Sequence, residues 1–158
     1  LPTNQKFVLQ IYKFNSYSVP MFRGGPQELD ARKKQYAIQW VSRLRAGGGT
    51  NPWGGLSQAM QNDKVSQITI LSDGITNNTG RCFHNGRNMK YSECFAEYNA
   101  QRAQTSAGDV AIDSVSLGYD FCSGNTVPWW LSRYGSRFSP TWLGELASKN
   151  NGSCKHIQ

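Results

Sequence analysis

QITILSDG, at Gln67–Gly74, joins a compact run of apolar and β-branched residues to an abrupt break. The run QITIL has the length and composition of a β-strand. Ser72-Asp73-Gly74 ends it, because aspartate and glycine favour turns. The sequence therefore predicts a strand that delivers Asp73 at its carboxyl end.

Three other segments have the composition of strands. FVLQIYKF at 7–14 is rich in aromatic and β-branched residues and predicts a buried strand. VAIDSVSL at 110–117 predicts a strand that ends at Gly118. Lys155-His156-Ile157 indicates the beginning of one further strand.

Helical patterns alternate with these strands. Apolar residues recur every three or four positions between Leu29 and Leu44, which predicts an amphipathic helix that ends at Gly47-Gly48-Gly49. Further helices are predicted at about Pro52–Gln61, at Glu93–Ala107 and around Trp142–Ala147. The alternation predicts a single α/β domain over residues 1–158, with a Rossmann-like, doubly wound, mainly parallel sheet flanked by helices.

The composition is that of a folded, basic protein. The chain has 158 residues, of which 38% are hydrophobic, and Lys+Arg 17 against Asp+Glu 10 gives a net charge of +7. No apolar run approaches the length of about 20 residues that is needed to span a bilayer, so no transmembrane segment is expected. The charge favours acidic partners, but no nucleic-acid-binding motif accompanies it, and we expect no specific nucleic-acid binding.

The four cysteines, Cys82, Cys94, Cys122 and Cys154, contain no CxxC pair, so disulfides are expected in place of a zinc site. Cys82 and Cys94 flank a polar loop with the turn-forming dipeptide Asn85-Gly86, across which a local link is geometrically reasonable. Cys122 and Cys154 would then pair by elimination, although the sequence leaves the pairing open. Glycosylation patterns at Asn77 and Asn151 also suit a secreted, cell-surface or periplasmic protein.

Two polar residues stand out by their positions. Thr50 follows the triple glycine and precedes a helix, and Asp73 follows a buried strand, so both are expected at one rim of the sheet. A carboxylate, a hydroxyl and water form an oxygen environment that suits Mg²⁺. The alternative is structural: Thr50 caps a helix and Asp73-Gly74 makes a turn.

Four segments together resemble a von Willebrand factor type A (vWA) domain. They are GGGTNPWGGLSQAM (47–60), ITILSDG (68–74), VAIDSVSLG (110–118) and LGELASKNNGSCKHI (143–157), and their order and spacing match the family. FVLQIYKFNSYSVPMF (7–22) resembles the second strand of that family and its short antiparallel edge strand. The resemblance covers nearly the whole chain.

The resemblance implies a metal-ion-dependent adhesion site (MIDAS). In the family an Asp-x-Ser-x-Ser loop, a Thr and an Asp form this site, and the last two correspond to Thr50 and Asp73, which would hold Mg²⁺, Mn²⁺ or Ca²⁺. Asp-x-Ser-x-Ser does not occur in this sequence. In the family, the strands of the sheet lie in the order three, two, one, four, five, six. The resemblance further implies that the first strand, which carries this loop, is missing from this sequence. An associated N-terminal fragment or a partner chain that donates a strand is expected to fill the gap. The alternatives are a rearranged sheet, in which the neighbouring strands pair directly, and a truncated form of the protein.

The sequence thus predicts a non-enzymatic adhesion domain that binds a protein or extracellular-matrix ligand. A complete metal site is expected only if the missing loop is supplied from elsewhere, and binding is otherwise metal-independent. The expected ligand-binding residues are Gly49, Asn51, Trp53, Gly74, Thr76, Trp129 and Trp130.

Two other functions remain open. A small basic secreted hydrolase or nuclease would need His84 and His156 together in a cleft. An assembly subunit would instead be completed by a strand from a partner.

Overall fold

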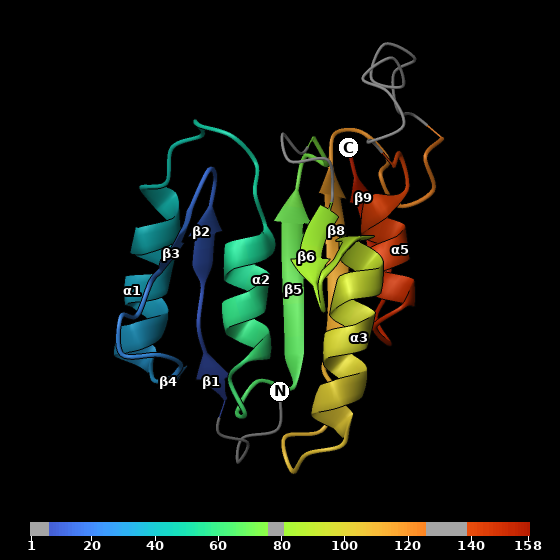
Figure 1. Ribbon diagram of the computed structural model, residues 1–158. Helices are drawn as coiled ribbons and strands as arrows, with labels where there is room; N and C mark the ends of the chain where they lie inside the picture. Colours follow the sequence, from blue (N-terminus) through green and yellow to red (C-terminus); the bar gives the residue numbers. More distant parts are fainter. Residues whose placement is uncertain (1–6, 76–80, 126–138) are drawn as a thin grey trace. The chain divides into compact units, whose positions relative to one another are not determined.

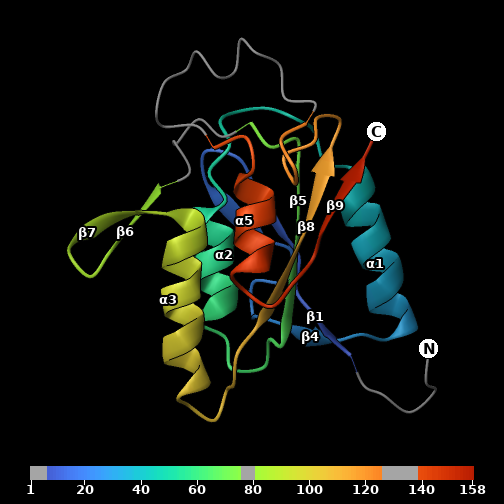
Figure 2. The same cartoon turned by 90° about the vertical axis from the view of Figure 1, so that its right-hand side faces the viewer.

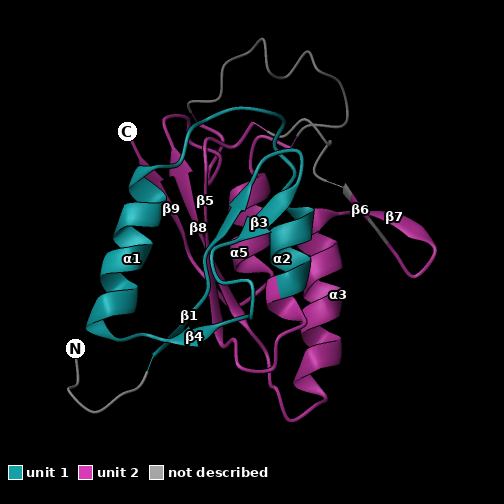
Figure 3. Ribbon diagram, turned by 90° about the vertical axis from the view of Figure 1, so that its left-hand side faces the viewer, with its two compact units in different colours: residues 1–58 teal, residues 59–158 magenta. Residues whose placement is uncertain are grey.

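The computed structural model describes residues 7–75, 81–125 and 139–158. The chain divides into two compact units, Leu1–Gln58 and Ala59–Gln158, coloured separately in Figure 3. The division falls inside helix α2 (Trp53–Met60), and each unit is described by itself. The single domain over residues 1–158 stays a prediction.

The first unit contains two short antiparallel ladders, labelled in Figure 1. Strand β1 (Val8–Leu9) pairs with β4 (Gln27–Glu28), and β2 (Tyr12–Phe14) pairs with β3 (Ser18–Pro20). The β2–β3 hairpin matches the last residues of the expected strand and the antiparallel edge strand expected after it.

The prediction of one buried strand over 7–14 is wrong. Gln10 interrupts it, because its side chain accepts a hydrogen bond from the N–H of Phe22 at 3.0 Å and donates one to the Phe22 carbonyl at 2.7 Å. A side chain thereby takes the place of a ladder partner between β1 and β2. The segment is also not buried, since Phe7 and Val8 are 45% and 46% exposed.

Helix α1 (Ala31–Ser42) lies inside the predicted amphipathic segment. Asp30 directly precedes it as the N-cap, and the Asp30 carboxylate accepts a hydrogen bond from the N–H of Lys33 at 2.7 Å. Within α1 only Ala37 is buried, at 6% exposure, and Ile38 and Val41 remain 55% and 47% exposed. Helix α2 lies within the predicted Pro52–Gln61 segment.

The second unit is built on a three-stranded parallel sheet. Its strands are β5 (Gln67–Ser72), β8 (Ala111–Leu117) and β9 (Cys154–Ile157), in the order β5-β8-β9. The three predicted strands are confirmed, and each starts or ends within a few residues of its expected position.

Helices α3 (Tyr91–Ala103) and α5 (Trp142–Ser148) both cover one face of this sheet, as Figure 2 shows. Ile70 and Ile112 are buried on that face, at 4% and 0% exposure, whereas Leu71 on the opposite face is 56% exposed. The α/β class is confirmed. Because the described helices α3 and α5 lie on one side, the doubly wound arrangement is not established within this unit.

A hairpin and two disulfides complete the second unit. Strands β6 (Arg81–His84) and β7 (Arg87–Lys90) are joined by the predicted tight turn, in which Asn85 and Gly86 have φ of 49° and 74°. The disulfide Cys82–Cys94 links β6 to α3. The disulfide Cys122–Cys154 links the segment after β8 to β9, so both expected pairings occur.

None of the helices described in the structure is both long enough and apolar enough to cross a membrane.

Candidate functional site

Asp73 lies directly after β5, at the carboxyl end of the parallel sheet, and its side chain is exposed. Its Oδ1 accepts a hydrogen bond from the N–H of Ile75 at 3.2 Å, and the Ser72 hydroxyl accepts one from Gly74 at 3.0 Å. The carboxylate therefore closes a turn, as the structural alternative predicts. No hydrogen bond to its second oxygen, Oδ2, comes from the residues that the structure describes.

The turn at Asp73 is fixed by the buried side chains of Phe121 and Trp142. Gly74 has φ of +77°, and a Cβ at this position would lie 1.7 Å from the Phe121 ring. The Trp142 indole donates a hydrogen bond to the Gly74 carbonyl at 2.8 Å. Phe121 and Trp142 are 0% and 5% exposed, so Asp73 projects from a rigid base.

The carboxyl ends of the other two strands carry polar residues in register with Ser72. Ser72 pairs with Ser116 of β8, and Ser116 pairs with His156 of β9. The Ser116 hydroxyl donates to the Tyr119 carbonyl at 2.6 Å, and a ring nitrogen of His156 lies 2.7 Å from the Gly118 carbonyl. These side chains stabilise the loop after β8, which stands next to the Asp73 turn.

Asp120 in that loop is a second carboxylate at the carboxyl edge. Its Oδ1 accepts hydrogen bonds from the N–H groups of Cys122 and Ser123, each at 3.0 Å, and its Oδ2 binds the Ser123 hydroxyl. The bonds from Ser123 hold the pKa of Asp120 below its ordinary value. Sequence reasoning missed Asp120, although an aspartate in a loop that follows a strand and precedes a cysteine is a visible signal.

The segment around Thr50 is tied to the β2–β3 turn within the first unit. The Asn15 side-chain amide donates to the Gly47 carbonyl at 3.2 Å, and the N–H of Gly49 donates to the Ser16 hydroxyl at 3.0 Å. Thr50, between these contacts and α2, is half-buried. These bonds hold the triple glycine in a defined conformation.

The Asn51 side chain makes a turn at the start of α2. Its Oδ1 accepts a hydrogen bond from the N–H of Trp53, the first residue of the helix, at 3.2 Å. Within the described part of the chain, the Thr50 side chain accepts no hydrogen bond from the first turn of α2, so the structure does not show the helix cap that the structural alternative predicts.

The remaining predicted site residues are distributed over both units. Thr50 belongs to the first unit and Asp73 to the second, so their meeting at one rim stays a prediction. Gly49, Asn51 and Trp53 lie with Thr50, and Gly74 lies with Asp73. Thr76, Trp129 and Trp130 lie outside the described residues.

The residues present do not fit a complete magnesium site by themselves. Mg²⁺ prefers about six oxygen ligands, several of them carboxylates or water, and Thr50 and Asp73 offer one hydroxyl and one carboxylate that already accepts the Ile75 N–H. Within residues 7–75, 81–125 and 139–158, no three His, Cys, Asp or Glu side chains gather where they would hold a metal ion.

The two histidines have different surroundings. The His84 ring packs on Tyr98 with 4.4 Å between ring centroids, and its Nε2 lies 3.8 Å from Glu97. His156 instead contacts Gly118. Strands β6 and β9, which carry them, lie on opposite sides of the second unit in Figure 2.

Glu145 connects three elements of the second unit. Its Oε1 accepts hydrogen bonds from Ser139 and Thr141 at 2.8 and 3.0 Å, and its Oε2 lies 3.4 Å from both Lys90 Nζ and the Ser92 hydroxyl. Burial opposes ionisation of this carboxyl, but the hydrogen bonds and the Lys90 charge outweigh it and lower the pKa of Glu145.

Comparison of the sequence with known protein families and with curated proteins finds no match.

Proposed function

We propose that this chain is a vWA-like domain that binds a protein or extracellular-matrix ligand and catalyses no reaction. One observation carries the proposal, the parallel strand order β5-β8-β9. This is the order implied for the fourth, fifth and sixth strands of the resembled family. Helix α3 lies between β5 and β8 in the sequence, and α5 lies between β8 and β9, as parallel crossovers require.

The position of Asp73 supports a ligand-binding role for the carboxyl edge. In open α/β sheets, ligands bind beyond the carboxyl ends of the strands. Asp73 lies at that place, exposed and held by a turn whose Gly74 is locked by Phe121 and Trp142. A fixed side chain loses little conformational freedom when it binds a ligand, which favours affinity.

The edge of β5 supports completion by a further strand. Among the described strands, β5 pairs with β8 on one side and has no partner on the other. An unpaired row of backbone N–H and C=O groups is a template for strand addition. We propose that an N-terminal fragment or a partner chain supplies this strand.

The same strand decides whether a metal takes part in binding. If it brings an Asp-x-Ser-x-Ser loop, Thr50 and Asp73 would complete the ligand set for Mg²⁺, Mn²⁺ or Ca²⁺. Without it, we propose metal-independent binding by aromatic or basic loops.

Two disulfides support a location outside the reducing cytosol. We propose that the protein is secreted, cell-surface or periplasmic.

The test uses the purified protein with a panel of immobilised extracellular-matrix proteins, with Mg²⁺ or with EDTA. We expect saturable binding that Asp73→Ala weakens by about ten-fold. Asp63→Ala is the matched control. Asp63 is also an exposed aspartate, but it precedes β5 in the sequence, whereas Asp73 follows β5. Equal binding by wild type and Asp73→Ala, or equal losses in both variants, contradicts the proposed site.

Native mass spectrometry and a thermal titration with Mg²⁺ distinguish the two modes of binding. If a strand fragment is bound and Mg²⁺ raises the melting temperature, the result supports the metal-dependent mode. If Mg²⁺ leaves the melting temperature unchanged, the result supports the metal-independent mode.

A further inference from the structure

Nearly all of the net positive charge belongs to the first unit. Residues 1–58 contain eight Lys and Arg against two Asp and Glu, a net charge of +6. Residues 59–158 contain nine against eight, a net charge of +1. A charge asymmetry of this size favours an anionic partner for the first unit.

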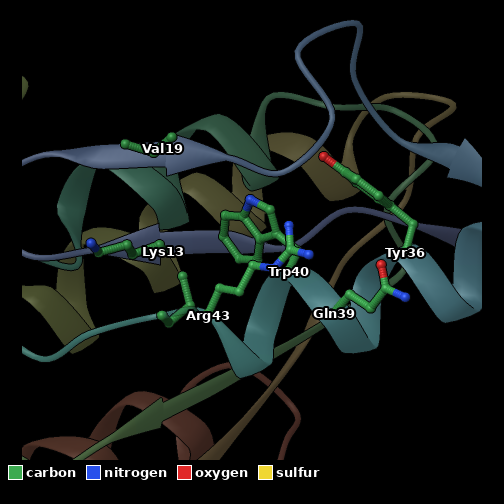
Figure 4. A pocket seen from close by; sticks show the side chains of 7 residues that line it. Lys13, Val19, Tyr36, Gln39, Trp40 and Arg43 are labelled. Carbon is green, nitrogen blue, oxygen red and sulfur yellow. The ribbon is translucent and has the colours of Figure 1, made fainter.

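The first unit also contains a groove of about 320 Å³, shown in Figure 4. Strands β2 and β3 supply Lys13 and Val19, which are paired neighbours in the ladder. Helix α1 and the residues after it supply the rest of the lining, which is Tyr36, Gln39, Trp40, Arg43 and Leu44.

The two cations of the groove, Lys13 and Arg43, have no ion-pair partner among the described residues. No acidic side chain lines the groove. Neither acidic residue of the first unit, Glu28 or Asp30, is part of the lining, and Asp30 caps α1 and lies 3.7 Å from Lys33. Both cations are therefore available to carboxylates from a ligand.

The rest of the lining is apolar or aromatic. Tyr36 stacks on Phe22 with 5.9 Å between ring centroids, and Val19 and Tyr36 remain 39% and 47% exposed. With Trp40 and Leu44 they form a recess that a ligand side chain would remove from water. Exposed aromatic and apolar groups flanked by cations are typical of protein interaction sites.

We propose that this groove binds an acidic peptide segment of a partner protein. An apolar or aromatic side chain of the peptide lies against Val19, Trp40 and Leu44, and its acidic residues pair with Lys13 and Arg43. The groove consists of residues that the proposed function does not use. A test of peptide binding by the groove is therefore independent of a test of that function.

The apolar recess distinguishes a peptide from other polyanions. A sulfated polysaccharide or a nucleic-acid backbone would bind a row of cations, and would gain little from Val19 and Leu44. A peptide gains from both the cations and the recess.

The test selects random linear peptides on phage against the wild-type protein, with counter-selection on Arg43→Glu. We expect selected peptides with an aromatic or large apolar residue flanked by Asp or Glu. Their affinity should fall by about ten-fold or more in Arg43→Glu and in Lys13→Glu. Lys34→Glu is the matched control, since it makes the same charge change on the exposed surface of α1 outside the groove, and it should alter affinity by less than about three-fold.

Trp40→Ala tests the recess, and circular dichroism and thermal melting of every variant establish that it folds. The proposal is overturned if no peptide is enriched, if enriched peptides lack acidic residues, or if Lys34→Glu weakens binding as much as Arg43→Glu. Binding of heparin that depends on Trp40, with no enriched peptide, would assign the groove to a polysaccharide and also overturn it.

Discussion

The side chain of Asn99 binds both polar groups of the Val110 backbone. Its Oδ1 accepts the Val110 N–H at 2.7 Å, and its Nδ2 donates to the Val110 carbonyl at 2.7 Å. The same Nδ2 lies 3.3 Å from Oδ1 of Asn150, which is 0% exposed. One amide thus joins α3 to the residue before β8 and to the residues that follow α5.

Asn99→Leu should lower the free energy of unfolding by about 3 kcal/mol. The leucine is similar in shape, but it leaves the N–H and the carbonyl of Val110, itself 0% exposed, without these hydrogen bonds. Urea denaturation measures the change. Gln101→Leu on the exposed side of α3 is the control, with a change within about 0.5 kcal/mol. Similar losses in both variants would show that Asn99 has no special role.

Gly74→Ala should destabilise the protein far more than Gly86→Ala. Both glycines have positive φ, 77° and 74°, so alanine meets similar backbone strain, about 1–2 kcal/mol, at both positions. A Cβ at Gly74 also collides with the buried Phe121 ring, whereas nothing lies within 4 Å of one at Gly86. Thermal melting of the two variants compares them. Equal melting temperatures would mean that a Cβ at position 74 does not clash with the Phe121 ring.

Glu145 should make stability depend on pH in acid. The folded-state pKa lies below the ordinary value of 4.5, so the stabilisation is fully present above the unfolded pKa and is lost as pH falls through the folded one. Wild type should exceed Glu145→Gln by about 1–2 kcal/mol at neutral pH. The difference should shrink below about pH 4.5.

Urea denaturation at several pH values measures this difference. Asp63→Asn is the control, because Asp63 is exposed and its carboxylate accepts no hydrogen bond from the described residues. A constant difference between wild type and Glu145→Gln from neutral pH to pH 3 contradicts the prediction.

Removal of the disulfide Cys122–Cys154 should cost more than removal of Cys82–Cys94. The two bonds span sequence separations of 32 and 12, and the entropy of the unfolded chain predicts losses of about 4 and about 3 kcal/mol. Paired Cys→Ser variants and thermal melting test the order. The opposite order would show that the folded state around the hairpin, rather than the unfolded chain, sets these costs.

Local patterns predicted most helices and strands correctly. The sequence signals for β5, β8 and α1 each lie within a short stretch of chain. They are the β-branched runs at 67–72 and 111–117 and the periodic apolar residues of α1. The strand at 7–14 was predicted wrongly because its interruption depends on Gln10 contacting Phe22, a contact that periodicity does not record. The predicted end of α3 at Ala107 lies four residues too late, since the Thr105 hydroxyl binds the Arg102 carbonyl and the Ala107 N–H there.

The candidate site was predictable only in part. Asp73 was found because a turn follows a strand, which is a local signal. Its anchors were not, because Trp142 lies 68 residues from Gly74 and their contact exists only in the folded chain. The sequence predicts Asn51 as a binding residue, and its hydrogen bond to the N–H of Trp53 appears only in the structure.

The parallel sheet of the second unit also sets the order in which the chain can fold. Pairing β5 with β8 closes a loop from Ser72 to Ala111, and pairing β8 with β9 closes one from Leu117 to Cys154. Such distant contacts make folding slow, because chain entropy is lost before any ladder forms. Cys122–Cys154 holds the second loop closed in the unfolded oxidised chain. β9 can therefore join the sheet early in oxidised protein, and refolding after reduction should be slower.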